Sequence, residues 1–594
     1  MNCRRIVFSM AFASLSLVGL AQTCSQFRLD EVKLLPSRFQ ENMKRDSAWI
    51  ASIDVNRLLH SFRNTAGVFT SKEGGYMTVK KPGGWESLDC DLRGHITGHL
   101  LSAMANLQMK AKADSLVQGL AEVQRQYGTG YLSAFGEGLI DRNIQGKSVW
   151  APFYTLHKIV QGLIDQYTLC GNATALEVAK GMGLWAYNKL TPLDDATRRR
   201  MIRNEFGGFN EAMYNLYAIT KDERYLNVAR FFYHNDKVDP LKAGNKDLGT
   251  NHANTFIPKL LGECRNYELF GNEDSRHAAE LLFSTLTEDH AFVTGEVSDN
   301  EHLFKPETQS KHLTGYDGEN CCSYNLMKLS DHLFSWNPRS SVADYYERAL
   351  YNHILGQQDP ESSMVCYFTP LMTGGYRLYS TRDSSYWCCV GSGFECHSRY
   401  QSSIYFHSDN ALYVNIFIPS ELTWGDTNVR LSTRFPEDGK VTIIVSGASR
   451  RFDMKIRCPY WATYMKVNGK KAKVGSDGYA VVSRNWKQGD KVTLEFGMTL
   501  TEEPTKDNPS LVALKYGPVV LGARLAPVAH PFSDPKKYND YYTFDYGKHK
   551  DVEYNSVKDF RQTAPLHFEN ADGTKLEPLY NLHHCRYAVY LKKR

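Results

Sequence analysis

The sequence predicts a multidomain α+β protein, in which an (α/α)6 helical toroid is followed by one or more antiparallel β-sandwich modules. Amphipathic helices repeat through the first 400 residues, and two-residue alternation replaces them after residue 405. The chain of 594 residues is long enough for several domains. We therefore expect a helical domain over 22–404 and β-sandwich structure over 405–594.

Three tyrosines mark the helical repeat. Tyr167, Tyr217 and Tyr267 follow one another at a period of fifty residues. Each tyrosine ends an amphipathic helix, and a short polar turn and a second helix come after it. Helix pairs that repeat at a fixed period stack into an open solenoid or a closed ring, and about six pairs fit before residue 400. We favour the closed ring, with the open solenoid as the alternative.

Short alternating segments follow residue 405. Examples are ALYVNIFI, KVTIIVSG and KVTLEF, separated by turns rich in Gly, Asn and Asp. Many short strands with regular turns are typical of a β-sandwich. The final HCRYAVYLKK is strand-like and is expected to pair back onto a sheet. Because no clean linker separates the two halves, we expect them to pack together.

The first 21 residues are typical of a secretory signal peptide. Arg4 and Arg5 precede an apolar stretch that ends in small residues. A membrane anchor is the alternative, but the stretch is short for one, and Thr23 before Cys24 fits lipid attachment poorly. We expect a secreted or periplasmic protein without a stable membrane span. The balance of 70 basic and 65 acidic residues indicates no nucleic-acid partner.

Cysteine usage allows two interpretations. The chain has 13 cysteines, and removal of Cys3 with the signal peptide leaves an even number, which fits six disulfides. However, a chain of this size can build its own core, and dense disulfides belong mainly to small secreted domains. Cys388 directly precedes Cys389, and adjacent cysteines meet the geometry of a disulfide poorly. A metal site is the competing interpretation.

Glu319, Cys321, Cys388 and Cys389 are candidate ligands of that metal. Three thiolates and one carboxylate are ligand types that Zn²⁺ accepts in four-coordinate sites. A helix is expected to begin next to Cys321, and its N-terminus would help to keep thiolates ionised. The spacing alone fits a structural zinc as well as a catalytic one.

Several histidines and one acid precede the cysteines. His95, His99, His157 and His252 lie at the starts of helices of the inner type, and such starts converge at one end of a toroid. A single helical histidine is more often a packing residue. Glu301 lies in a helix-poor loop, where most glutamates are simply solvated.

The chain resembles the zinc-dependent β-L-arabinofuranosidase family of bacterial glycoside hydrolases. The segments that carry the resemblance include GWESLDCDLRGHITGHLLSA, YTLHKIVQGLID, SDNEHLF, GENCCSYNLMKL and YWCCVGSGFECHSRY. The resemblance implies an (α/α)6 barrel followed by β-sandwich modules. Cys322 and Cys396 depart from the family pattern and place two extra thiols near the motif.

The resemblance also implies a role for each candidate residue. Glu319, Cys321, Cys388 and Cys389 would bind Zn²⁺, with Cys388 as the nucleophile and Glu301 as the general acid/base. The substrate contacts would be His95, His157, His252 and Glu319.

The implied activity is exo-acting, retaining release of L-arabinose from β-L-arabinofuranosides of plant cell-wall glycans. Retaining hydrolysis needs a nucleophile and an acid/base on either side of the bond, and here a thiolate would replace the usual carboxylate nucleophile. One alternative is a hydrolase of another furanose or an acidic sugar on the same scaffold. Lyases and unsaturated-uronide hydrolases also use helical toroids. A further alternative is an exported glycan-binding protein with a structural zinc.

Overall fold

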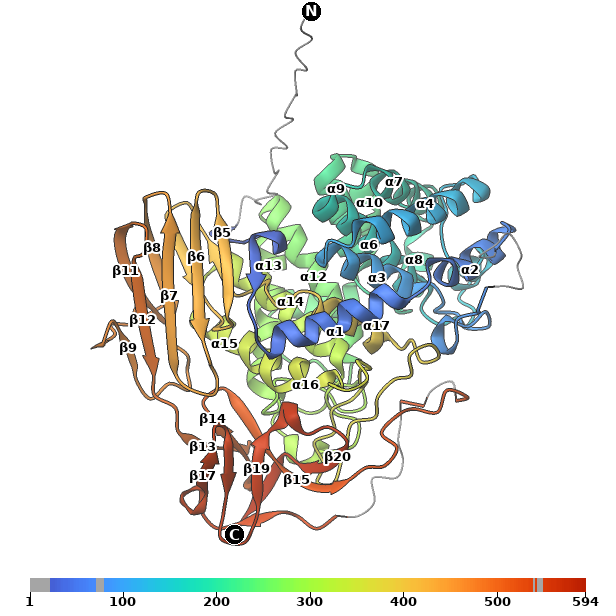
Figure 1. Ribbon diagram of the computed structural model, residues 1–594. Coiled ribbons are helices and arrows are strands. Elements are labelled where there is room, and N and C mark those ends of the chain that lie inside the picture. The colour runs from blue at the N-terminus through green and yellow to red at the C-terminus, as the bar shows by residue number, and fades with distance from the viewer. Residues whose placement is uncertain (1–21, 71–78, 538–539, 542–548) are drawn as a thin grey trace, which may run out of the picture.

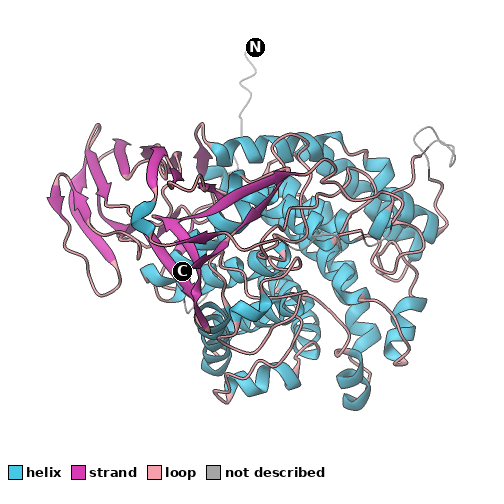
Figure 2. Ribbon diagram, turned by 90° about the horizontal axis from the view of Figure 1, so that it is seen from below, coloured by secondary structure: helices cyan, strands magenta, loops and turns pink. Residues whose placement is uncertain are grey.

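Helices and sheets occupy separate regions of the molecule (Figures 1 and 2). The computed structural model describes residues 22–70, 79–537, 540–541 and 549–594. The predicted signal peptide, residues 1–21, lies outside the described residues. Within them, we found no helix with both the length and the hydrophobicity needed to cross a membrane.

The helical domain is a closed double ring. In the described part of the chain six inner helices each pack against the next, and the last packs against the first. These inner helices are α3 (His95–Asn106), α6 (Pro152–Cys170), α9 (Phe209–Thr220), α12 (Ala253–Phe270), α14 (Asn320–Trp336) and α17 (Cys388–His397). The closed ring confirms the predicted toroid, and α6, α9 and α12 carry the three repeating tyrosines near their C-termini.

An outer helix packs against each inner one. The outer helices are α4 (Lys110–Tyr127), α7 (Ala173–Leu190), α10 (Glu223–Phe231), α13 (Glu273–Thr285), α15 (Ser340–Ala349) and α1 (Arg38–Ser52). Five of them directly follow their inner partner in sequence. The exception is α1, which comes from the start of the chain and covers α17. The other helices lie between the ring helices in sequence: α2 (Val55–Ala66), α5 (Gly138–Ile144), α8 (Asp195–Met201), α11 (Asn235–Lys242) and α16 (Leu355–Gln357).

Two sheets form the predicted β-sandwich. Their inward-facing residues alternate with exposed ones, as in β7 and β12, and share one hydrophobic core. The five-stranded sheet contains β1 (Ser25–Gln26), β3 (Tyr405–His407), β4 (Ala411–Val414), β8 (Arg450–Arg457) and β11 (Tyr479–Trp486). The seven-stranded sheet contains β10 (Lys470–Lys471), β9 (Met465–Val467), β12 (Lys491–Phe496), β7 (Lys440–Gly447), β6 (Thr427–Thr433), β5 (Ser420–Trp424) and β2 (Val32–Leu34).

The N-terminal strands differ from the sequence-based expectation. Residues 22–404 were expected to belong to the helical domain, but β1 pairs with β3 and β2 pairs with β5. The start of the chain therefore contributes an edge strand to each sheet of the sandwich. Both strands are too short for an alternating pattern to reveal them.

The C-terminal residues form a separate nine-stranded sheet. Pairing of β20 with β15, and of β21 with β14, confirms that the end of the chain returns to a sheet. Its strands are β13 (Leu500–Thr505), β14 (Asn508–Tyr516), β15 (Val519–Pro527), β16 (Glu553–Tyr554), β17 (Arg561–Ala564), β18 (His567–Glu569), β19 (Lys575–Pro578), β20 (Cys585–Ala588) and β21 (Tyr590–Lys593).

Candidate active site

The candidate residues lie where the inner helices begin. His95 is the first residue of α3, His252 and Glu319 are the N-caps of α12 and α14, and Cys388 is the first residue of α17. On α6, His157 accepts a hydrogen bond from the N–H of Gly208, the N-cap of α9, at 3.0 Å. Unpaired N–H groups and the helix dipole favour negative charge at such ends. The ring thus provides an environment suited to thiolates and carboxylates.

Glu319, Cys321, Cys388 and Cys389 come together as one buried cluster. A ligand atom from each lies within 4.8 Å of all the others. The sulfur of Cys389 is 3.5 Å from that of Cys321 and 4.0 Å from that of Cys388. Two sulfurs that each sit about 2.3 Å from a tetrahedral zinc are about 3.8 Å apart, so these separations suit a shared metal.

Glu319 gives independent evidence for a bound cation. Its side chain is fully buried, and neither carboxylate oxygen has a hydrogen-bond partner in the structure. A buried carboxylate without partners is costly unless a cation neutralises it. The donor set therefore fits Zn²⁺. Such complete burial supports the predicted role as a ligand more directly than the predicted contact with substrate.

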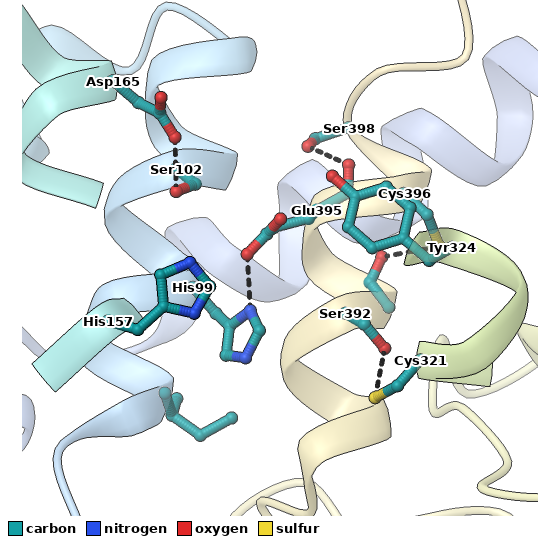
Figure 3. A network of polar contacts seen from close by, with 12 residues as sticks. His99, Ser102, His157, Asp165, Cys321, Tyr324, Ser392, Glu395, Cys396 and Ser398 are labelled. Carbon is teal, nitrogen blue, oxygen red and sulfur yellow. Dashed lines mark hydrogen bonds and ion pairs between the residues drawn. The ribbon is translucent and has the colours of Figure 1, made fainter. Parts of the chain in front are cut away.

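Charge within the cluster centres on Cys321. Burial opposes ionisation of this thiol, but hydrogen bonds with Cys388 and Cys389 outweigh burial and hold its pKa well below the ordinary value. The hydroxyl of Ser392, one turn along α17, lies 3.1 Å from the same sulfur. Figure 3 shows these two side chains facing each other from α14 and α17.

The two unexpected thiols stay outside the metal cluster. Cys322 is fully buried in a different hydrophobic core, and burial raises the pKa of its thiol. Cys396 lies two turns beyond Cys389 and donates to the carbonyl of Gly393 at 3.5 Å. All twelve cysteines that the structure describes are free, so the six-disulfide interpretation is wrong.

Glu301 stands at the tip of a tight loop next to α12. Its carbonyl accepts a hydrogen bond from the N–H of Ala253 at 2.8 Å, and one carboxylate oxygen lies 3.6 Å from Nε2 of His252. Burial opposes ionisation of the carboxyl, but the adjacent His252 keeps its pKa below the ordinary value. Conversely, Glu301 raises the pKa of His252 despite burial. The two side chains thus stabilise each other's charged forms.

Tyr367, which sequence reasoning missed, joins this pair to the cysteine cluster. Its hydroxyl donates to the carboxylate of Glu301, and the sulfur of Cys388 donates to the same hydroxyl at 3.2 Å. Tyr367 lies in a buried stretch without helical or strand periodicity and outside the segments that carry the family resemblance. No local signal distinguishes it from the other buried tyrosines.

The remaining histidines are buried across the ring. His95 is fully buried, with Nδ1 3.0 Å from a carboxylate oxygen of Glu86 and with Nε2 unpartnered. Burial lowers the pKa of His157 well below its ordinary value, which keeps its imidazole neutral. Figure 3 shows His99 pointing toward Glu395 of α17, with Nδ1 2.5 Å from the carboxylate. Glu395, which sequence reasoning missed, fastens the helix of Cys388 to α3.

Sequence models of one enzyme family match most of the chain. The model described as "Beta-L-arabinofuranosidase, GH127 catalytic domain" matches residues 31–402, and that of the GH127 middle domain matches residues 411–498. A relative from Bifidobacterium longum subsp. longum, named "Non-reducing end beta-L-arabinofuranosidase", is 23% identical over 490 residues. That alignment covers 70% of this chain and 72% of the relative.

Solved structures of the same family share the fold. A GH127 β-L-arabinofuranosidase from Geobacillus stearothermophilus T6 superposes with a TM-score of 0.70 at 16% identity, covering 95% of this chain and all of the other. A second structure, described as a GH127 β-arabinofuranosidase, gives a TM-score of 0.72 at 16% identity, covering 97% of this chain and 98% of the other.

The matching family models, together with a helical toroid, a β-sandwich and a buried cluster of acid and thiol groups, identify a glycoside hydrolase. Since the two family models together span the helical domain and the sandwich, the chain belongs to the GH127 β-L-arabinofuranosidase family.

Proposed function

We propose that this enzyme releases L-arabinose from the non-reducing ends of β-L-arabinofuranosides with retention of configuration. The observation that carries the proposal is the chain of contacts Cys388–Tyr367–Glu301, which brings a candidate nucleophile and a candidate acid/base to one small space. Cys388 is 7% exposed, the largest exposed fraction among the four candidate ligands. Retaining hydrolysis requires this pair of functions.

The roles of the side chains follow from their chemistry. The Cys388 thiolate attacks the anomeric carbon while Glu301 donates a proton to the departing glycosidic oxygen, which gives a thioglycosyl-enzyme and a free alcohol. Glu301 then takes a proton from water, and the resulting attack of that water frees arabinose and Cys388. His252 holds the exchangeable proton beside Glu301, and Tyr367 orients both reacting groups.

Glu319, Cys321, Cys388 and Cys389 would hold the Zn²⁺. When bound, zinc keeps thiols ionised near neutral pH, where a free thiol with a pKa of roughly 8.5 is mostly protonated. His95, His157 and His252 are proposed to bind the sugar hydroxyls. The sugar is proposed to come from plant cell-wall glycans. The enzyme is proposed to act outside the cytoplasm, and fractionation of the native host would test this location.

The test is release of L-arabinose from a β-L-arabinofuranosyl disaccharide. Wild-type enzyme should release it and lose activity after treatment with a zinc chelator. Cys388→Ser should lower kcat at least 1,000-fold, on the order expected when a covalent nucleophile is removed. Cys396→Ala, on the same helix but outside the cluster, is the matched control and should retain zinc and most activity. Near-wild-type activity in Cys388→Ser would reject the nucleophile assignment.

A glycan-binding protein with a structural zinc is the competing function. It predicts that Cys388 resists alkylation in the zinc-loaded protein and that substrate binds without turnover. The proposed enzyme instead predicts alkylation at Cys388, with protection by L-arabinose, measured by peptide mass spectrometry.

A further inference from the structure

Part of the C-terminal domain extends onto the helical domain. After β15 the chain leaves the nine-stranded sheet and runs along the helical domain (Figure 1). Tyr379 donates its backbone N–H to the carbonyl of Pro531 at 2.7 Å, and its own carbonyl accepts from the N–H of Ser533 at 2.8 Å. The hydroxyls of Ser533 and Ser385 lie 3.1 Å apart. Residues 531–533 therefore pack against the stretch that leads into α17, and Ser385 in that stretch is three residues before Cys388, where the helix begins.

Tyr541, which follows these residues along the chain after β15, is buried among aromatic side chains of the candidate active site. It is 8% exposed and belongs to the hydrophobic cluster that contains Cys388. Its ring stacks face to face on Tyr367, with centroids 4.3 Å apart and planes 13° apart. Trp85 and Trp387 pack against it in T-shaped geometry, at centroid distances of 5.7 and 5.5 Å. Such pairs are favourable beyond simple burial.

The ring of Tyr367 is in contact with two other aromatic rings. Tyr541 covers one part of the ring and Phe368 packs at a centroid distance of 4.6 Å. The hydroxyl of Tyr367 bonds both Glu301 and Cys388, so a swing of the side chain about its Cα–Cβ bond would move the oxygen and change both contacts together.

We propose that Tyr541 is a positioning residue of the active site, supplied by the C-terminal domain, and that it acts by clamping the ring of Tyr367. The proposal rests on the proposed function for the roles of Cys388 and Glu301. Tyr541 lies outside both segments that the family models match, 31–402 and 411–498.

The experiment is a double-mutant cycle of Tyr541→Ala and Tyr367→Phe. Tyr541→Ala should lower kcat on the disaccharide about tenfold or more, with a smaller change in KM, because a misplaced catalytic group costs rate more than binding. Tyr541→Phe keeps the stacking ring and should recover most of that loss. In the Tyr367→Phe background no hydroxyl remains to be positioned, so adding Tyr541→Ala should change kcat less than threefold.

A second measurement does not depend on the substrate. Acrylamide quenching of tryptophan fluorescence should increase in Tyr541→Ala, because Trp85 and Trp387 lose their cover. The exposed Tyr464→Ala on the sandwich is the matched control and should leave both quenching and kcat unchanged. If wild-type enzyme cleaves no β-L-arabinofuranoside but quenching still increases, the proposed function fails and the docking of Tyr541 stands. Unchanged quenching, or fully additive losses in the cycle, would overturn the positioning role.

Discussion

Glu301, the proposed acid/base, shows how the backbone fixes the position of a side chain. Both Asn300 and Glu301 have positive φ angles, 48° and 68°, which non-glycine residues rarely adopt. The surrounding hydrogen bonds impose this conformation, since the N–H of Asn300 donates to the carbonyl of Tyr316 at 3.0 Å. Strain of this kind persists where the structure over-determines it, often at functional sites. The carboxylate is therefore presented from a rigid loop.

Replacing Glu301 should separate proton donation from nucleophilic attack. Glu301→Ala should lower kcat about 100-fold or more on a disaccharide, and much less on an aryl glycoside whose leaving group needs no proton. Azide should restore part of the rate, since a small anion can replace the missing base. Steady-state kinetics on both substrates provides the measurement. Glu307→Ala, an exposed loop carboxylate nearby, is the control, and equal losses on both substrates would contradict the acid/base role.

At this scale the sequence predicted the residues with distinctive chemistry. Adjacent cysteines and a Glu-x-Cys motif are uncommon patterns, and the structure brings all four of the candidate metal ligands together. Tyr367 and Glu395 could not be found this way, because their importance comes from contacts made across the ring. A buried tyrosine has the same local pattern whether it packs or positions.

Between elements, glycines set the spacing of the inner ring. A Cβ on Gly98 of α3 would lie 2.1 Å from the carbonyl carbon of Lys158 on α6, and one on Gly162 would lie 2.4 Å from the carbonyl oxygen of Gly98. The two helices therefore touch backbone to backbone. This contact brings the histidines of α3 close to the first turns of α6, which carry His157.

Gly98→Ala should force α3 and α6 apart. Overpacking a tight core costs about 1–3 kcal/mol, and a backbone contact that cannot relax puts this site at the upper end or beyond. Denaturant unfolding measures the loss. Gly138→Ala in α5, where a new Cβ meets no atom within 4 Å, should change the free energy of unfolding by less than about 0.5 kcal/mol. Equal stability of both variants would show that the ring tolerates separation.

The contact between α12 and α14 should give the protein a specific acid sensitivity. Glu268 on α12 is buried, which favours its neutral form, but His332 at 2.6 Å and other partners lower its pKa to about 2. Because its folded-state pKa is depressed, the ionised Glu268 contributes up to about 3 kcal/mol to the free energy of unfolding. This contribution is present above pH about 4.5 and is lost as the pH falls toward 2. In that window Glu268→Gln should show a shallower decline in unfolding free energy. Glu280→Gln, on the surface, should decline like wild type.

At the scale of the molecule, the sequence predicted the classes of structure better than their connections. Periodicity identified the repeated helix pairs and the strands of the sandwich, because both patterns extend over many residues, while closure of the ring was only the favoured of two arrangements. The pairing of β1 and β2 with distant strands, and the reach of Tyr541 into the helical domain, depend on short segments. Their positions are decided by tertiary contacts that no local pattern records.

Arg457 connects the sandwich to the ring. It is fully buried on β8 and pairs with Asp344 and Glu347 of α15. Arg457→Ala should cost about 3–5 kcal/mol, because it leaves two carboxylates buried without their cation. Calorimetry should show a lower melting temperature. Arg430→Ala, which breaks an exposed pair with Glu421, should change stability by less than about 1 kcal/mol.

The packing of α1 against α17 has a consequence for the order of assembly during biosynthesis. The helix that carries Cys388 is the last inner helix to be synthesised, and its outer partner is the first helix of the chain. The four candidate metal ligands lie on or directly before α14 and α17, which are neighbours in the ring, so the set is complete only after α17 has been synthesised. A chain that ends before Cys388 would hold two of the four candidate ligands. Metal uptake would thus report that α17 has packed against α14.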